Sequence, residues 1–170
     1  MTLSRRSLSF GLLAAAATSR LAQAQSLPAP SERVILTVTG KISVTNSEQS
    51  ARFDRRMLEQ FGSQGFIART PWYAEPVRFD GVRMSTLLRA VGASGDTVIA
   101  TALNDYETCI PVSDFTEFEV LLALKRDGEY MAVRDKGPLF IVYPYDSDPV
   151  LKHQRFYSRS AWQVVRMVVL

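Results

Sequence analysis

The chain has 170 residues, of which 46% are hydrophobic and 22% are charged, as in folded globular proteins. Its 20 basic and 17 acidic side chains give a formal net charge of +3, but three of the basic residues and none of the acidic ones fall within residues 1–24. Residues 25–170 are therefore balanced, with 17 side chains of each sign. This balance excludes an electrostatic basis for binding nucleic acid or an anionic membrane.

The first 24 residues have the organisation of an export signal. The pair Arg5 and Arg6 precedes an apolar segment over residues 10–18, which is far shorter than the roughly 20 residues of a membrane span. Ala22-Gln23-Ala24 is a small-x-small cleavage site. Ser-Arg-Arg-x-Leu resembles the twin-arginine export signal, and the general secretory route is the alternative. We expect a periplasmic protein cleaved after Ala24, with residues 25–170 forming a single domain.

The first half of the mature chain is expected to contain two strands and two short helices. Alternating side chains predict a strand over Val34–Thr39. Apolar residues at helical spacing predict a helix over Asp54–Phe61, in which Asp54 is the N-cap and Gly62 the stop. A second strand is expected over Phe66–Thr70. A second helix is expected over Ser85–Val91, with Ser85 as its N-cap.

The second half is expected to be mostly strand. Two polar dipeptides predict hairpin turns, Asn104-Asp105 and the stronger Asp127-Gly128. Leu139–Tyr143 is a short, unbroken apolar run, which predicts a strand buried on both faces. Strands with few short helices predict an α+β fold with mixed β-sheets. The other expected strands are Thr97–Leu103, Tyr106–Ile110, Val120–Lys125, Glu129–Met131 and Trp162–Val169.

The chain has one cysteine and one histidine, so it cannot form an intrachain disulfide or a histidine-rich metal site. Cys109 lies in an expected strand, where a single cysteine is usually a small buried hydrophobe. His153 lies in a polar segment and is expected to be exposed. We assign no protein residue as a metal ligand.

A charged loop leads into the buried run at Leu139. It contains Arg134, Asp135 and Lys136, followed by Gly137, which permits a close backbone approach. Such a loop can present polar groups to a ligand from a rigid base. A solvated turn before a core strand is the alternative.

A series of short motifs runs in order along the mature chain: Phe79-Asp80-Gly81-Val82, Leu87-Leu88-x-x-Val91-Gly92, Asp105-Tyr106, Ile110-Pro111, Val120-Leu121-Leu122-Ala123, Asp127-Gly128-Glu129, Gly137-Pro138-Leu139 to Pro144, and Trp162. The series resembles the molybdopterin-binding domain of the sulfite oxidase superfamily, in its small periplasmic form. The resemblance covers the chain from about Leu36 to Val169. It implies a sulfite-oxidase-type α+β fold in which a pterin cofactor is reached from strand ends and loops.

The chain departs from that family at two places. Sulfite oxidases hold molybdenum through a cysteine thiolate where this chain has Thr70, and a hydroxyl is a far weaker ligand for a sulfur-preferring metal centre. The family's loop His-Gly-x-Pro-x-Arg has Asp135 in place of the histidine and Phe140 in place of the arginine. The resemblance implies that Arg134, Lys136 and Arg159 instead form one anion-binding patch for a phosphate, since guanidinium groups bind phosphate in a bidentate manner.

Two functions stay open. The first is a periplasmic oxidoreductase-type protein that binds molybdopterin, the molybdenum cofactor, without a protein thiolate and acts on an unknown substrate. The second is a non-catalytic relative whose cleft binds a small ligand or a protein partner, as a sensor or accessory protein. The residues expected at the cofactor cleft are Arg69, Thr70, Asn104, Asp105, Tyr106, Arg134, Asp135, Lys136, Arg159 and Ser160.

Export gives the first testable prediction. N-terminal sequencing of protein from the periplasmic fraction should begin at Gln25, because cleavage is expected after Ala24. Replacing both Arg5 and Arg6 by Lys should block export if the twin-arginine route is used, and unchanged export would assign the general secretory route. A cytoplasmic protein with an intact Met1 would contradict the prediction.

Overall fold

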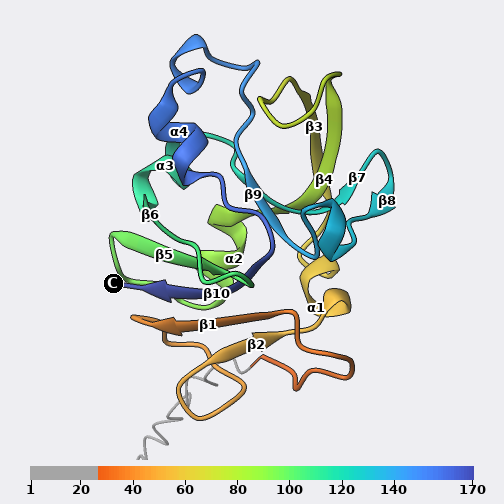
Figure 1. Cartoon of the computed structure of the whole chain (residues 1–170). Coiled ribbons are helices and arrows are strands. Elements are labelled where there is room, and N and C mark those ends of the chain that lie inside the picture. Colours follow the sequence, from red (N-terminus) through yellow and green to blue (C-terminus); the bar gives the residue numbers. More distant parts are fainter. Residues whose placement is uncertain (1–26) are drawn as a thin grey trace, which may run out of the picture.

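The computed structural model describes residues 27–170, so the export signal expected over residues 1–24 lies outside the described residues. The described chain forms two β-sheets with short helices at their margins (Figure 1). Mixed sheets with few short helices confirm the α+β fold. Within residues 27–170, no helix combines the length and the apolar character needed to cross a bilayer.

The first sheet joins the two ends of the described chain. Its strand order is β2-β1-β10-β5-β6, with β1 and β10 parallel and the other pairs antiparallel. β1 therefore lies beside the last strand of the chain, in the middle of the sheet. The strands are β1 (Leu36–Gly40), β2 (Ala51–Phe53), β5 (Thr97–Ala102), β6 (Glu107–Pro111) and β10 (Val164–Val169).

The second sheet has the order β3-β4-β7-β8, and β9 pairs with β7 off this path. The register between β4 and β7 shifts between Asp80 and Gly81. A Cβ atom at Gly81 would collide with the Leu122 backbone, so the close pairing of β4 with β7 requires glycine there. The strands are β3 (Gln64–Ala68), β4 (Val77–Arg83), β7 (Leu121–Arg126), β8 (Glu129–Tyr130) and β9 (Phe140–Val142).

Strand β9 links the two sheets (Figure 1). Residues 139–143 are completely buried, which confirms the prediction of a strand covered on both faces. The Ile141 N–H donates to the Ala161 carbonyl at 2.8 Å, and the Val164 N–H donates to the Leu139 carbonyl at 3.0 Å. β9 therefore fixes the start of β10 while it pairs with β7.

Among the described residues, four short α-helices lie around the sheets: α1 (Arg55–Glu59), α2 (Met84–Ala90), α3 (Val112–Glu117) and α4 (Gln154–Arg159). Two 3-10 turns cover Val133–Asp135 and Pro149–Leu151. Helices α1 and α2 were predicted, but the cap assigned to Ser85 is wrong. Helix α2 begins one residue earlier, at Met84, and Arg83 at its N-cap makes no side-chain capping bond. The Met84 N–H donates instead to the Val120 carbonyl, so the neighbouring strand replaces a capping side chain.

Both predicted hairpins are confirmed. β5 pairs with β6 across the Asn104-Asp105 turn, and Asp105 adopts φ 60°. β7 pairs with β8, and both Asp127 and Gly128 have positive φ, as a tight two-residue turn requires.

The prediction of a buried Cys109 is wrong, because its side chain is exposed. β6 is an edge strand whose side chains alternate, and Ile110 supplies the buried face. His153 is exposed as predicted, and its Nδ1 accepts the Arg155 N–H at 3.2 Å to cap α4.

Asp54 is a buried carboxylate that joins the start of the described chain to α1. It caps α1 as predicted, since Oδ1 accepts the Met57 N–H at 2.8 Å. Its Oδ2 accepts the N–H groups of Ser31 at 2.8 Å and Glu32 at 3.0 Å. Burial by itself raises the pKa of Asp54, but the N–H groups of Met57, Glu32 and Ser31 outweigh burial and hold that pKa below its usual range.

We predict that Asp54→Asn lowers the free energy of unfolding by about 1–2 kcal/mol at pH 7, the usual cost of losing a capping carboxylate. A lowered folded-state pKa stabilises the fold above the unfolded pKa of about 4, and this contribution is lost as the pH falls through the folded value. The difference in the free energy of unfolding between wild type and Asp54→Asn should therefore shrink below about pH 4. Urea unfolding at several pH values measures it, with the exposed Glu117→Gln as control. A gap that does not depend on pH would contradict this role of the charge.

Candidate functional site

One cleft of about 510 Å³ opens where both sheets and α4 meet. Its walls come from the loop after β3, the end of β5, the β5–β6 turn, α4 and the segment that leads into β10. The lining residues are Pro71, Trp72, Ala102, Asn104, Tyr106, Gln154, Tyr157, Ser158, Ser160, Ala161 and Trp162.

Trp72 holds one wall of the cleft in place. Its ring packs edge-to-face against four aromatic rings, with centroid distances between 5.4 and 6.2 Å. Such edge-to-face contacts between aromatic rings fix ring orientation as well as burying area. The wall is therefore preformed. The four partners are Phe140, Tyr145, Tyr157 and Trp162.

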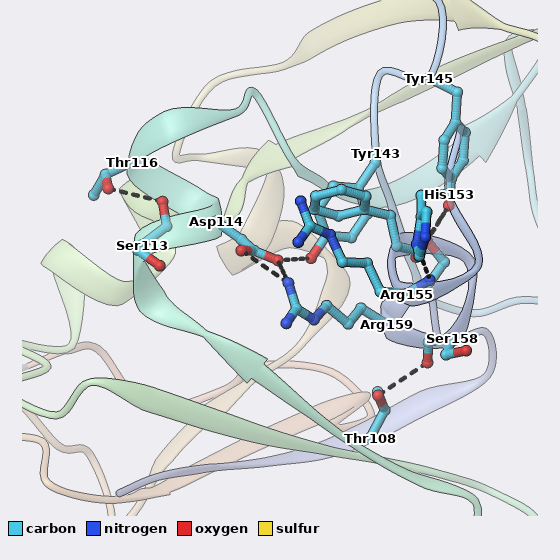
Figure 2. A network of polar contacts seen from close by, with 12 residues as sticks. Thr108, Ser113, Asp114, Thr116, Tyr143, Tyr145, His153, Arg155, Ser158 and Arg159 are labelled. Atoms are coloured by element: carbon cyan, nitrogen blue, oxygen red, sulfur yellow. Dashed lines mark hydrogen bonds and ion pairs between the residues drawn. The ribbon is translucent and has the colours of Figure 1, made fainter. Parts of the chain in front are cut away.

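The opposite wall is α4, which is bound to β6 through one backbone carbonyl. The Ser158 carbonyl accepts the hydroxyls of Tyr106 and Thr108, each at 2.9 Å. Figure 2 shows the bond to Thr108. At the end of α4 the Ser160 hydroxyl is hydrogen-bonded to the buried hydroxyl of Tyr145. Burial raises the pKa of Tyr145, so this phenol stays protonated at neutral pH. These bonds position the polar side of the cleft.

The cleft carries no formal charge at neutral pH. Among residues 27–170, those that line it include no Asp, Glu, Lys, Arg, His or Cys. The polar groups are amides, hydroxyls and indole N–H groups. Chemically, the cleft can stack and hydrogen-bond a ligand, but it offers neither a thiolate nor a charged partner.

Six of the ten residues expected at a cofactor cleft lie in or beside the cleft. Asn104, Tyr106 and Ser160 line it, and Asp105 lies in the same turn. Thr70 is buried beside the lining residue Pro71, and its Oγ1 accepts the Trp72 N–H at 3.4 Å. The Arg69 N–H donates to Asp146 at 2.7 Å, which ties this loop to the segment after β9.

The loop before β9 is not part of the lining. The Arg134 side chain is 88% exposed, and its Nε lies 3.5 Å from Asp135 Oδ2. The Lys136 ammonium lies nearer the cleft, 5.1 Å from the ring centroid of Trp162 and 5.5 Å from that of Tyr73. The charge of Lys136 is therefore stabilised by two aromatic faces.

Arg159, which the sequence places in one anion-binding patch with Arg134 and Lys136, pairs with a carboxylate on α3. Its Nη1 lies 2.8 Å from Oδ2 and 3.1 Å from Oδ1 of Asp114 on α3 (Figure 2). The Tyr143 hydroxyl donates to the same Asp114 carboxylate at 2.6 Å. Burial and this bond raise the pKa of Tyr143. Arg159 serves the packing of α4 on α3, because Asp114 is buried and attracts the nearest guanidinium.

Sequence reasoning missed much of the aromatic and amide lining, namely Trp72, Gln154 and Tyr157. The sequence predicted a polar segment around His153, over residues 152–155, and no helix there. The pair Phe156-Tyr157 was the available signal. Phe156 turns into the core while Tyr157 reaches the cleft.

The sequence model of one family, described as the oxidoreductase molybdopterin binding domain, matches residues 32–145. This match confirms the resemblance seen in the motifs. No curated protein matches the chain.

The cleft residues do not fit the metal centre of that family. Molybdenum sites in it use a thiolate, whereas Cys109 is exposed on β6 and is not a lining residue. Within residues 27–170, no group of three His, Cys, Asp or Glu side chains is placed to hold a metal. In this described part of the chain, no Lys or Arg side chain lines the cleft to bind a phosphate either. We therefore derive no reaction through molybdenum.

We predict that Arg159→Ala lowers the free energy of unfolding by about 2–3 kcal/mol, because it leaves the buried Asp114 with one partner. Arg155→Ala on the same helix is the matched control, because Arg155 is exposed and its guanidinium lies 4.5 Å from the ring centroid of Phe156. Arg155→Ala should lower the free energy of unfolding by less than about 1 kcal/mol. Urea unfolding at pH 7 measures both variants. Equal small losses would contradict a structural role for Arg159 and restore it as a candidate for anion binding.

Proposed function

Since the chain belongs to the oxidoreductase molybdopterin binding domain family, we propose that it is a ligand-binding member that holds a small organic molecule without molybdenum. The observation that supports this is the neutral, aromatic lining of the cleft beside Thr70, where the family has its metal-ligating cysteine. The fold retains a cleft there, but the residues that would hold a metal and a phosphate are absent from its lining.

The size of the cleft supports a small-molecule ligand. Its volume of about 510 Å³ lies within the range of roughly 300–1,000 Å³ that is usual for such sites. The lining combines apolar rings with a few polar groups, which is the usual composition of a site for an organic molecule. A rigid wall reduces the entropy lost when the ligand binds.

Thr70 supports a role without metal. Its side chain is buried, and its hydroxyl oxygen already accepts the Trp72 N–H. That bond stabilises the turn that places Trp72 in the cleft wall. Thr70 therefore has a structural use at the position where the family binds its metal.

The second candidate is a molybdopterin-dependent oxidoreductase, which membership of the family favours. In that case the cofactor would contact Asn104, Tyr106 and Ser160, with no protein thiolate on its metal. The two candidates differ in what the protein contains when it is purified, and this difference is directly measurable.

We also propose that the mature protein acts in the periplasm, as a sensor or accessory protein that recognises its ligand there. Support comes from Arg5-Arg6 and from the cleavage site that ends at Ala24. A preformed cleft suits a protein that binds its ligand after export.

The test is the content of protein purified from the periplasm. Native mass spectrometry should find an organic adduct on the wild-type chain, and elemental analysis should find molybdenum far below one atom per chain. Gln154→Trp should remove the adduct, because the added indole would occupy the cleft. Glu117→Trp, at an exposed position on α3 outside the lining, is the matched control and should retain it.

One molybdenum atom per chain, together with a pterin, would contradict the proposal and assign the oxidoreductase. An adduct that survives in Gln154→Trp would place the bound molecule outside the cleft and would also contradict it.

A further inference from the structure

Several polar side chains that line the cleft have hydrogen-bond donors without a protein partner among residues 27–170. Within residues 27–170 no protein partner satisfies the indole N–H of Trp72 or Trp162, and neither is sealed from solvent. The Asn104 Oδ1 accepts the Tyr106 N–H at 3.3 Å, which leaves its NH₂ group to donate. An indole N–H can only donate, and an amide NH₂ carries two donors.

Gln154 adds a side-chain amide that can both donate and accept hydrogen bonds. Within the described residues its side-chain amide has no protein partner, while its backbone carbonyl accepts the Ser158 hydroxyl at 3.0 Å. The Tyr157 hydroxyl is likewise without a protein partner in this part of the chain and can donate or accept. A bound molecule that excludes water from the cleft must supply acceptors to these groups, because an unsatisfied buried donor costs about 1–3 kcal/mol.

The aromatic rings that line the cleft meet at steep angles. The Trp72 ring is inclined at 84° to the Tyr157 ring and at 71° to the Trp162 ring. Such a corner can stack one flat ring on a face while a second aromatic side chain meets its edge. One side of this corner is already polarised, because the Lys136 ammonium lies over the Trp162 ring.

We propose that the ligand of this cleft is an uncharged heteroaromatic ring system, rich in carbonyl or ring-nitrogen acceptors and without a phosphate group. This inference rests on the proposed function, because it specifies the ligand of the same cleft. A charged group would be desolvated there without an opposite charge in the lining. A sugar also stacks on indole, but it has no flat ring to fill the aromatic corner, and the lining within residues 27–170 contains no carboxylate to accept its many hydroxyl donors.

The experiment uses the purified mature protein and four probes: lumichrome, riboflavin, flavin mononucleotide and glucose. The first two are neutral rings with several acceptors, the third adds a phosphate to riboflavin, and the fourth is a neutral sugar. Binding is measured by isothermal titration calorimetry, and quenching of tryptophan fluorescence reports contact with the cleft. We expect lumichrome and riboflavin to bind, and flavin mononucleotide to bind at least about tenfold more weakly than riboflavin.

Two variants test the contacts. Gln154→Leu keeps the volume but removes the amide, and it should weaken riboflavin binding about three- to tenfold, the usual effect of one neutral hydrogen bond. Gln60→Leu, at an exposed position after α1, is the matched control and should leave the affinity unchanged. Gln154→Trp should abolish binding and quenching together.

Equal or tighter binding of flavin mononucleotide would overturn the inference, as would failure of both neutral rings to bind. Glucose binding that Gln154→Trp abolishes would overturn the ligand class but leave the proposed function intact. Molybdenum bound to the purified protein would remove the proposed function itself. The ligand class and the proposed function can therefore be refuted separately.

Discussion

The fold and the cleft both depend on the backbone hydrogen bonds that strand β9 makes on its two sides. One side pairs with β7, and on the other side Leu139 and Ile141 hold Val164 and Ala161. β9 is wholly apolar and buried, so these bonds form away from water, where an unpaired backbone group is costly. Without them the second sheet would lose its link to β10. The segment that carries Ala161 and Trp162 into the cleft would lose its position as well.

The distribution of charge follows from the same packing. Arg159 is drawn to the buried carboxylate of Asp114, and Lys136 lies over two aromatic rings. From the sequence, both cations were expected at a cofactor, whereas in the structure they contact a carboxylate on α3 and two aromatic rings. The lining of the cleft consists of rings, amides and hydroxyls. This family's fold is thus retained while the chemistry of its cleft is neutral.

The elements that could be predicted from the sequence have strong local signals. β9 is a short apolar run between Gly-Pro and Pro, the turn at Asp127-Gly128 needs two positive φ angles, and Asp54 precedes a helical apolar pattern. The ordered series of family motifs allowed the sequence to identify Asn104, Tyr106 and Ser160 as residues of the cleft. The pair Arg159–Asp114 was not predictable, since its members are 45 residues apart on two short helices without a clear pattern. Cys109 was misplaced because alternation along a strand does not reveal which face is buried.

Whether this cleft binds a neutral ring and no metal can be seen in a crystal structure of protein purified from the periplasm, with anomalous data collected at the molybdenum absorption edge. We expect planar electron density against Trp72 and Trp162, and no anomalous peak in the cleft. An anomalous peak beside Thr70, with phosphate density reaching Lys136, would contradict this expectation.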